Sequence, residues 1–219
     1  MIPMIRKLIG LALVLLVVAV VPEAAAHFLF QSGIAAAVAK RDPGAQHVSA
    51  RVPVPMLPNL LTKATLSKVT VSARHVDLRT VTADWVTATA TGVHVNLPSS
   101  LINKRAQITH VDHIHLTLTF TEEEASARLP PGFKFVFGKD TVTLQGLATS
   151  VTGTFRLEPP ARIVFTIVGS SVPGLTRLAP ISFSVPPLAA CVQSVALNPH
   201  ALTVTCDEAN PSTDLLPHP

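Results

Sequence analysis

The sequence predicts an α+β fold in which a long, curved antiparallel sheet wraps against two or three helices. Long segments alternate apolar and polar residues, which is the period-two pattern of half-buried strands. Only a few short segments carry helix signals, and they lie among these strands. The chain of 219 residues is 48% hydrophobic and 14% charged, against about 25% charged residues in a typical soluble domain. Such a chain must either bury a large apolar surface or hold something apolar.

Residues 1–26 have the composition of a targeting segment and are excluded from the predicted fold. Arg6 and Lys7 precede an unbroken apolar run over 8–21, and the AAA at 24–26 matches the small-residue pattern of a cleavage site. The apolar run is shorter than the ~20 residues that span a bilayer. We therefore predict a cleaved signal peptide, with an uncleaved N-terminal membrane anchor as the alternative. Either one exports the rest of the chain to the periplasm or cell envelope.

Residues 27–206 are predicted to form a single domain, followed by a flexible proline-rich tail over 207–219. Near the end of this domain, Cys191 and Cys206 flank two alternating runs with the turn NPHA midway between them. A hairpin with this turn places the two cysteines nearly opposite each other. We predict that they form a disulfide, because the chain is predicted to be exported. Two free buried thiols are the alternative.

Three segments at the start of the domain have distinct local signals. Residues 27–40 are alanine-rich and favour a helix, and residues 47–55 are extended with prolines near one end, as in an edge strand. Residues 56–64 favour a short helix with Pro58 early, where proline is tolerated. The strand that follows changes phase near Arg74, which predicts a β-bulge there.

The segment HVDHIHLTLTF (110–120) holds three histidines and an aspartate, which raises the question of a metal site. In a strand, its apolar side chains share one face: Ile114, Leu116, Leu118 and Phe120. Strict alternation assigns His110 and Asp112 to the start of that same face, so that only His113 and His115 lie together on the polar face. A zinc site takes three or four converging ligands. We therefore predict a polar strand face and no metal site, with His113 and His115 as the remaining candidates.

The next segment, TEEEASARL, predicts a helix start. Thr121 and Glu124 form the T-x-x-E pattern of a capping box, and the glutamates at 122–124 suit the positive end of a helix. We interpret these glutamates as helix-start residues rather than as paired catalytic carboxylates. A strand follows in which Phe133, Phe135 and Phe137 share one side.

Motifs of catalysis are absent from the sequence. It contains no GxSxG elbow, Walker loop, GxGxxG or HExxH pattern, so we predict a protein that is not an enzyme and needs no cofactor. The net charge of +4 is not concentrated in a lysine or arginine cluster, which argues against nucleic acid as a partner.

Three stretches carry a resemblance to a known family: PVPMLPNLLTKATLSKVTVSARHVDL, LTFTEEEASARLPPG and LAACVQSVALNPHALTVTC. Their order, over roughly residues 27 to 206, resembles the LmeA-like family of actinobacterial envelope proteins, named for lipomannan elongation factor A. In that family a P-x-L-x-x-L-L-like turn and helix precedes a strand with a V-x-V-x-A-x-x-V pattern. The matching residues here are Leu57, Leu60 and Leu61, then Val69, Val71, Ala73 and Val76. The resemblance implies a sheet similar to tubular lipid-binding domains, with phospholipid as ligand and a role in envelope lipid or lipoglycan biogenesis.

The expected function is therefore to bind phospholipid or a related amphiphile at the membrane surface, either holding it there or transferring it. Burying an acyl chain stabilises a complex by ~0.8 kcal/mol per CH₂ and needs an apolar cavity rather than a polar motif. The predicted lining residues are Leu57, Leu60, Leu61, Ile114, Leu116, Leu118, Phe120, Phe133, Phe135 and Phe137. One alternative is a non-catalytic structural or interaction module of the envelope with no ligand cavity. Another is a metal-dependent hydrolase that uses His113 and His115.

Overall fold

The computed structural model describes most of the predicted domain. The described residues are 27–28, 30–36, 38–40, 42–78, 82–96, 98, 100, 108–127, 129–147, 149–158, 162–171, 181–184 and 191–211. The signal peptide or anchor predicted over 1–26 lies outside them. No helix among the described residues is long and apolar enough to cross a bilayer.

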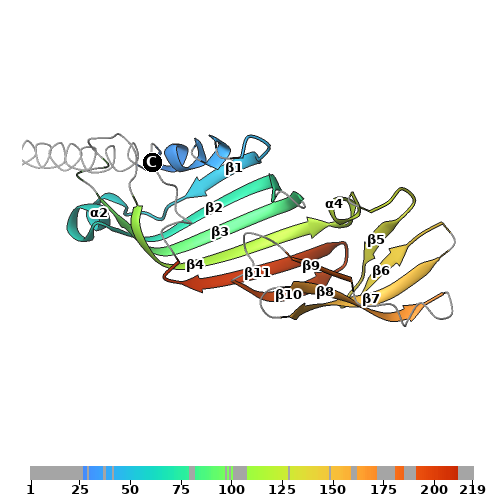
Figure 1. Ribbon diagram of the computed structural model, residues 1–219. Helices are drawn as coiled ribbons and strands as arrows, with labels where there is room; N and C mark the ends of the chain where they lie inside the picture. The colour runs from blue at the N-terminus through green and yellow to red at the C-terminus, as the bar shows by residue number, and fades with distance from the viewer. Residues whose placement is uncertain are drawn as a thin grey trace, which may run out of the picture.

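Strands in two antiparallel sheets dominate the structure, and the helices are short (Figure 1). The larger sheet has the order β1 (Gln46–Arg51), β2 (Thr65–Asp77), β3 (Thr82–Val95), β4 (Ile108–Thr121), β11 (Ala201–Ala209), β10 (Val192–Asn198). The smaller sheet has the order β5 (Lys134–Phe137), β6 (Val142–Gln145), β7 (Ser150–Glu158), β8 (Arg162–Ser170), β9 (Ile181–Ser184). Helix α2 spans Leu57–Lys63, helix α4 spans Glu122–Ser126, and the described residues within 27–40 are helical.

The sheet-dominated α+β class is confirmed, but the prediction of one long sheet is wrong. After β4 the chain passes through α4 into β5 and builds the smaller sheet, which lies at the end of the larger sheet opposite α2 (Figure 1). The hairpin of β10 and β11 then returns, and β11 pairs with β4 from Ala201 opposite Thr121 to Ala209 opposite His113. Alternation marks each strand in the sequence, but it does not say which strands pair across a long connection.

The edge strand β1 and helix α2 follow their local sequence signals. Helix α2 has Pro58 in its first turn, where a missing amide costs no helical hydrogen bond. It ends at Ala64, whose left-handed backbone (φ 50°) lets its amide donate to the Leu60 carbonyl oxygen at 2.9 Å. The side chain of Leu60 is buried beneath the helix. The predictions of an edge strand and a short helix here are both confirmed.

Helix α4 begins with the predicted capping box. The Glu124 amide donates to Thr121 Oγ1 at 3.3 Å, and the Thr121 amide donates to Glu124 Oε2 at 3.2 Å. Glu122 lies outside the capping box, and its Oε1 accepts a hydrogen bond from the Phe137 amide at 2.6 Å. That bond ties α4 to β5 at the junction of the two sheets.

Two apolar clusters pack against one face of the larger sheet, which we call the inner face; the opposite side is the outer face. The first cluster lies between the sheets and includes Ala83, Leu118, Phe120, Leu202, Val204, Phe137, Val142, Val151, Ile163 and Phe165. The second cluster lies at the α2 end and includes Val52, Met56, Leu60, Leu66, Val69, Val93, Val95 and Val111, with Phe30 and Ile34 packed against it. The inner face is thus covered at both of its ends.

Between the two clusters the inner face is only half-buried. The strand register places Val71, Ala88 and Leu116 in one row across β2, β3 and β4, and Ala90 and Ile114 in the next. All five side chains are of intermediate exposure. Strand β3 contributes only alanines to these two rows. The layer of side chains on the inner face is therefore thinnest over the middle of β3.

An irregularity lies at the predicted place near Arg74, because the next residue, His75, has a left-handed backbone with a φ of 54°. The register of β1 with β2 shifts between Gln46 and Ser49, opposite Arg74 and Ser72. The pairing of β2 with β3 keeps one register on both sides of Arg74. The phase change in the sequence of β2 therefore coincides with the left-handed residue His75 in β2 and with a bulge in its partner β1.

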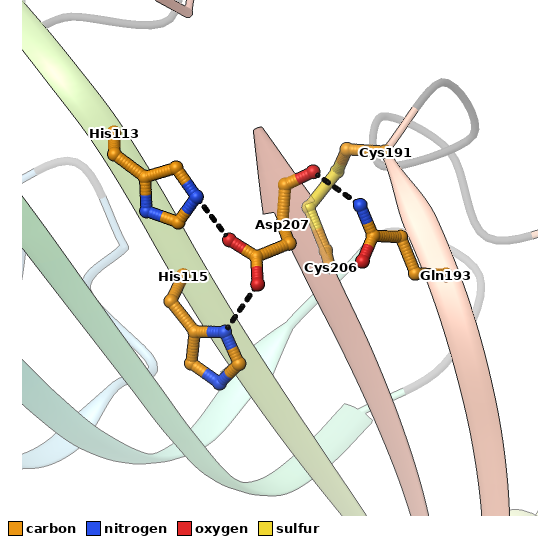
Figure 2. Close-up of a disulfide and its surroundings, with 6 residues drawn as sticks. All are labelled: His113, His115, Cys191, Gln193, Cys206 and Asp207. Carbon is orange, nitrogen blue, oxygen red and sulfur yellow. Dashed lines mark hydrogen bonds and ion pairs between the residues drawn. A yellow bond between two sulfur atoms is a disulfide. The ribbon is translucent and has the colours of Figure 1, made fainter. Parts of the chain in front are cut away.

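The predicted disulfide between Cys191 and Cys206 is present, with the two Cα atoms 5.0 Å apart (Figure 2). The predicted start of the tail at residue 207 is wrong, because β11 continues to Ala209 and keeps its pairing with β4. Residues 212–219 lie outside the described part of the chain.

Candidate functional site

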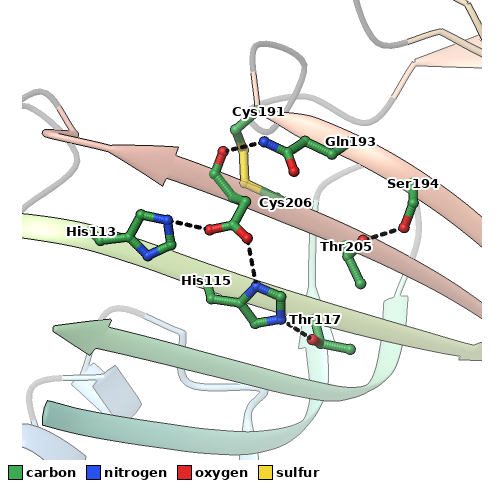
Figure 3. Close-up of polar contacts among 9 residues, drawn as sticks. His113, His115, Thr117, Cys191, Gln193, Ser194, Thr205 and Cys206 are labelled. Atoms are coloured by element: carbon green, nitrogen blue, oxygen red, sulfur yellow. Dashed lines mark hydrogen bonds and ion pairs between the residues drawn. A yellow bond between two sulfur atoms is a disulfide. The ribbon is translucent and has the colours of Figure 1, made fainter.

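Hydroxyl-bearing side chains cover the outer face of the larger sheet. One row crosses five strands in register: Ser72, Thr87, Thr117, Thr205 and Ser194. The hydroxyl groups of Ser194 and Thr205 are hydrogen-bonded to each other (Figure 3). The next row contains Thr70, Thr89, His115 and Asp207. The polar strand face predicted for β4 is therefore one part of a larger polar surface.

The alternation of side chains is interrupted at the same level on three adjacent strands. Under strict alternation, two residues that are three positions apart lie on opposite faces of a strand. Three such pairs nevertheless lie together in or against the α2-end cluster: Leu66 and Val69, Ala90 and Val93, Val111 and Ile114. In β4 this requires two consecutive residues, Asp112 and His113, to face outward. Gly92 lies at the same level in β3 and has a φ of +60°, which a glycine adopts without steric cost.

This interruption overturns the predicted placement of His110 and Asp112. Both were assigned to the apolar face by strict alternation, yet Val111 between them is 2% exposed and faces inward. The side chains of His110 and Asp112 are 46% and 57% exposed. All three histidines of the segment therefore share the outer face, and His94 of β3 lies beside them.

The first group on this face, the Asp207 cluster, contains His113, His115 and Asp207 (Figure 2). Asp207 Oδ2 lies 3.2 Å from His115 Nδ1, and Oδ1 lies 2.5 Å from His113 Nε2. The second contact lacks hydrogen-bond alignment. His115 Nε2 lies 3.4 Å from Thr117 Oγ1, and Gln193 donates to the Asp207 carbonyl oxygen at 3.0 Å. One carboxylate thus separates the two histidines that the sequence offered as metal candidates.

The second group, the Asp112 cluster, contains His94, His110 and Asp112. Asp112 Oδ1 lies 3.2 Å from His94 Nε2 and 3.4 Å from His110 Nε2, so both imidazoles approach one carboxylate oxygen. The two rings are tilted by 50° with centroids 5.4 Å apart. The Asp112 carboxylate lies over Gly92, where an added Cβ would come within 1.9 Å of Oδ2. The missing side chain at Gly92 therefore makes the room that the carboxylate occupies.

A third group of potential ligands lies at the junction of β2, β3 and α4. Ligand atoms of His75, Asp84 and Glu124 all lie within 4.8 Å of one another. This group is poorly suited to a cation, since the Arg74 guanidinium lies 3.9 Å from Asp84 Oδ1. In addition, Glu124 Oε2 is already engaged by the capping box.

The ten predicted cavity residues do not share one environment. Leu118, Phe120 and Phe137 are buried in the cluster between the sheets, and Leu116 and Phe135 pack against it. Leu60 is buried in the cluster at the α2 end, Ile114 packs against it, and Leu57 is half-buried on α2. Leu61 and Phe133 are 76% and 42% exposed. Of this set, only Leu116 and Ile114 lie on the half-buried middle of the inner face.

A cleft of about 580 Å³ lies at the edge formed by β1, and none of the ten predicted residues lines it. Its walls are His27, Gln31, Ser49, Ala50, Arg51, Val52, Pro53, Lys68 and Thr70. Ser49 pairs with Ser72 of the outer face and Ala50 pairs with Val71 of the inner face, so the cleft lies at the β1 edge where the two faces of the sheet meet. The cleft carries two cationic side chains, Arg51 and Lys68.

The sequence-based reasoning missed two members of the outer-face groups, Asp207 and Asp112, and the glycine that lies beneath Asp112. Asp207 was assigned to a flexible tail, and it reaches the histidines only because β11 pairs with β4. Gly92 and Asp112 were missed because their positions depend on the interruption shared by neighbouring strands. The histidine spacing was the signal available, but it did not show where the alternation breaks.

Comparison of the chain with protein-family models, with curated proteins and with solved structures finds no match.

Proposed function

We propose that this protein is exported and binds a phospholipid or related amphiphile in the cell envelope, with its acyl chain on the inner face of the larger sheet. The observation that carries the proposal is the half-buried apolar strip between the two packed clusters. Val71, Leu116 and Ile114 border it, and Ala88 and Ala90 form its floor. Apolar surface left partly open in this way is stabilised by an acyl chain at ~0.8 kcal/mol per CH₂.

The cleft at the β1 edge supports an anionic head group. Arg51 and Lys68 lie in its wall, and among the described residues neither has an ion-pair partner within 4.0 Å. The neighbouring Ser49 and Thr70 supply hydroxyl groups. Because the cleft lies at the β1 edge, where Ala50 pairs with Val71, the lipid would place its head group at that edge and its chain on the inner face.

Two observations support export. The sequence of 1–26 has the pattern of a signal peptide or membrane anchor, and the Cys191–Cys206 disulfide suits an oxidising compartment. The resemblance to the LmeA-like family points to the same setting and to envelope lipid or lipoglycan biogenesis.

The proposal is tested by expressing the full chain in a host that exports it, then combining native mass spectrometry with organic extraction. We expect phospholipid to co-purify at a defined stoichiometry. Ala88→Trp fills the strip and should abolish the bound mass, whereas Thr89→Trp places the same side chain on the outer face and should leave it unchanged. Thermal unfolding of both variants confirms that they are folded. Protein that takes up no lipid even from added vesicles contradicts the proposal.

A structural or interaction module without a ligand is the second candidate. It is favoured by exposed apolar side chains on the smaller sheet and its loops, namely Phe133, Leu147 and Val168. Leu147 is 96% exposed, and its side chain lies within 4.0 Å of the position that a Cβ at Gly132 would take, next to Phe133. Under this alternative Leu147→Ser disrupts co-purification of a protein partner while the purified chain carries no lipid.

A further inference from the structure

We propose that the α2 end of the molecule docks on the surface of a bilayer that contains anionic phospholipid. The docking surface consists of three exposed apolar side chains, Phe28, Val54 and Leu61, with basic side chains beside them. Docking deepens the proposed function and rests on it, since a protein that takes up phospholipid must contact the membrane that supplies it. The contact itself is measurable whether or not the protein carries lipid.

The three apolar side chains belong to segments that lie side by side. His27 Nε2 donates to the Val52 carbonyl oxygen at 2.6 Å, which holds the start of the first helix against the connection that contains Val54. The Asn59 side chain donates to the Pro55 carbonyl oxygen at 2.9 Å, which ties the same connection to α2. The first helix, this connection and α2 therefore form one end of the molecule (Figure 1).

Each of the two helices at this end buries one side and exposes a large apolar residue on another. Phe30 packs against the α2-end cluster and Leu60 is 5% exposed within it, whereas Phe28 and Leu61 are 70% and 76% exposed. Val54 is 67% exposed between them in the chain. A single exposed leucine is common on protein surfaces. Large apolar side chains that are exposed on three adjoining segments instead mark a surface for an apolar partner.

The charges at this end favour a membrane over a protein partner. Residues 43–76, which contain β1, α2 and most of β2, hold four lysines and arginines and no aspartate or glutamate. Arg51, Lys63 and Lys68 are exposed, and among the described residues none of them has an ion-pair partner within 4.0 Å. Basic groups beside apolar side chains are the combination that binds anionic lipid surfaces.

The connection between β3 and β4 has the same charge pattern. Residues 96–107 contain two basic and no acidic residues. Strand β3 ends next to α2, because the Val95 amide donates to the Ala64 carbonyl oxygen at 2.8 Å. Two separate stretches of the chain that meet at the α2 end therefore lack acidic residues, and this end would not be repelled by an anionic bilayer.

Docking at this end also suits the position of the proposed head-group cleft. The wall of the cleft extends to Pro53, the neighbour of Val54 in the chain, and it includes Arg51 and Lys68. With the apolar side chains in the bilayer, the cleft would lie close to the phospholipid head groups. A lipid would then pass from the membrane to the cleft without crossing bulk water.

The experiment uses the exported full chain with an environment-sensitive fluorophore on one introduced cysteine. Both native cysteines are held in the Cys191–Cys206 disulfide, so the introduced thiol is labelled selectively. On addition of vesicles of phosphatidylcholine mixed with phosphatidylglycerol, we expect the emission of a probe at Leu61→Cys to shift to shorter wavelength. A probe at Leu147→Cys, which is 96% exposed on the smaller sheet, should not shift. The reverse result places the contact at the opposite end and overturns the proposal, as does the absence of any shift.

The lipid concentration that gives half of the shift tests the apolar and the basic contributions separately. Phe28→Ser should raise it by about tenfold, because burying a large apolar side chain changes an equilibrium by at least this much. Lys63→Gln should raise it by about fivefold, whereas Lys139→Gln, an exposed lysine of the smaller sheet, should leave it unchanged. Equal values for the two lysine variants, or for vesicles of phosphatidylcholine alone, contradict anionic lipid as the partner.

A last variant separates docking from lipid uptake. Ala88→Trp fills the strip and should remove the co-purifying lipid, but the probe at Leu61→Cys should still shift in this background. A shift in a chain that never takes up lipid contradicts the proposed function alone. A chain that carries lipid and shows no shift contradicts the docking surface alone.

Discussion

The two faces of strand β4 differ in the burial and the polarity of their side chains. On the inner face, Val111, Leu118 and Phe120 are each at most 3% exposed, and they join the larger sheet to the helices at one end and to the smaller sheet at the other. On the outer face, the histidines are 41–46% exposed and contact carboxylates from the same strand and from β11. The difference indicates that the inner face supplies most of the free energy of folding, while the outer face holds ionisable side chains that remain accessible to solvent.

The largest expected effect is at the centre of the inner face. Leu118 is 1% exposed in the cluster between the sheets. Leu118→Ala should lower the free energy of unfolding by about 3 kcal/mol, because it removes buried methyl groups and leaves a cavity. Urea unfolding followed by circular dichroism measures this. The matched outer-face change in the same strand, Thr117→Ala, should cost less than about 1 kcal/mol; equal effects would contradict the division between the faces.

The disulfide is expected to have the next largest effect. Cys191→Ser combined with Cys206→Ser opens a loop of 15 residues and should lower the free energy of unfolding by about 3 kcal/mol or somewhat less. The physical reason is the larger conformational freedom of the unfolded chain. The comparison is with the unchanged protein, oxidised and reduced. If reduction leaves the unfolding midpoint where it was, the hairpin does not depend on the crosslink.

A smaller effect is expected at Gly92, which lies where the alternation of side chains between the two faces is interrupted. Gly92→Ala forces a Cβ to within 1.9 Å of Asp112 Oδ2 and places a side chain at a φ of +60°. We expect a loss of about 1–2 kcal/mol from backbone strain and displacement of the carboxylate. Gly169→Ala is the control, since nothing lies within 4 Å of its added Cβ. Thermal unfolding that is equally affected in both variants would show that glycine flexibility, rather than the carboxylate, matters at Gly92.

The smallest effect is expected for the outer-face ion pairs. Asp207→Asn removes the charge between His113 and His115, whose side chains are 41% and 46% exposed. Exposed pairs of this kind contribute about 0–1 kcal/mol, and salt weakens them further. Unfolding at low and at high ionic strength should therefore show a difference from the unchanged protein only at low salt. A loss as large as that of Leu118→Ala would show that the outer face also carries stability.

Local features of the fold followed from short stretches of sequence. The capping box at Thr121 and Glu124, the short helix with Pro58 and the cysteine hairpin each depend on residues close together in the chain, so their signals could be interpreted directly. The division into two sheets could not, because the pairing of β11 with β4 joins Thr121 to Ala201, with the whole smaller sheet between them in the chain.

The sequence by itself determined that the chain is rich in alternating strands, that β4 has an apolar and a polar side, and that histidine and aspartate gather at its start. Only the tertiary structure decided that His110, Asp112 and His94 face the same way and that Asp207 lies between His113 and His115. The physical reason is that an interruption of the pleat is shared by paired strands. Its position depends on how the inner-face residues Val93 and Val111 pack together, and on Gly92 leaving room for a neighbour's carboxylate.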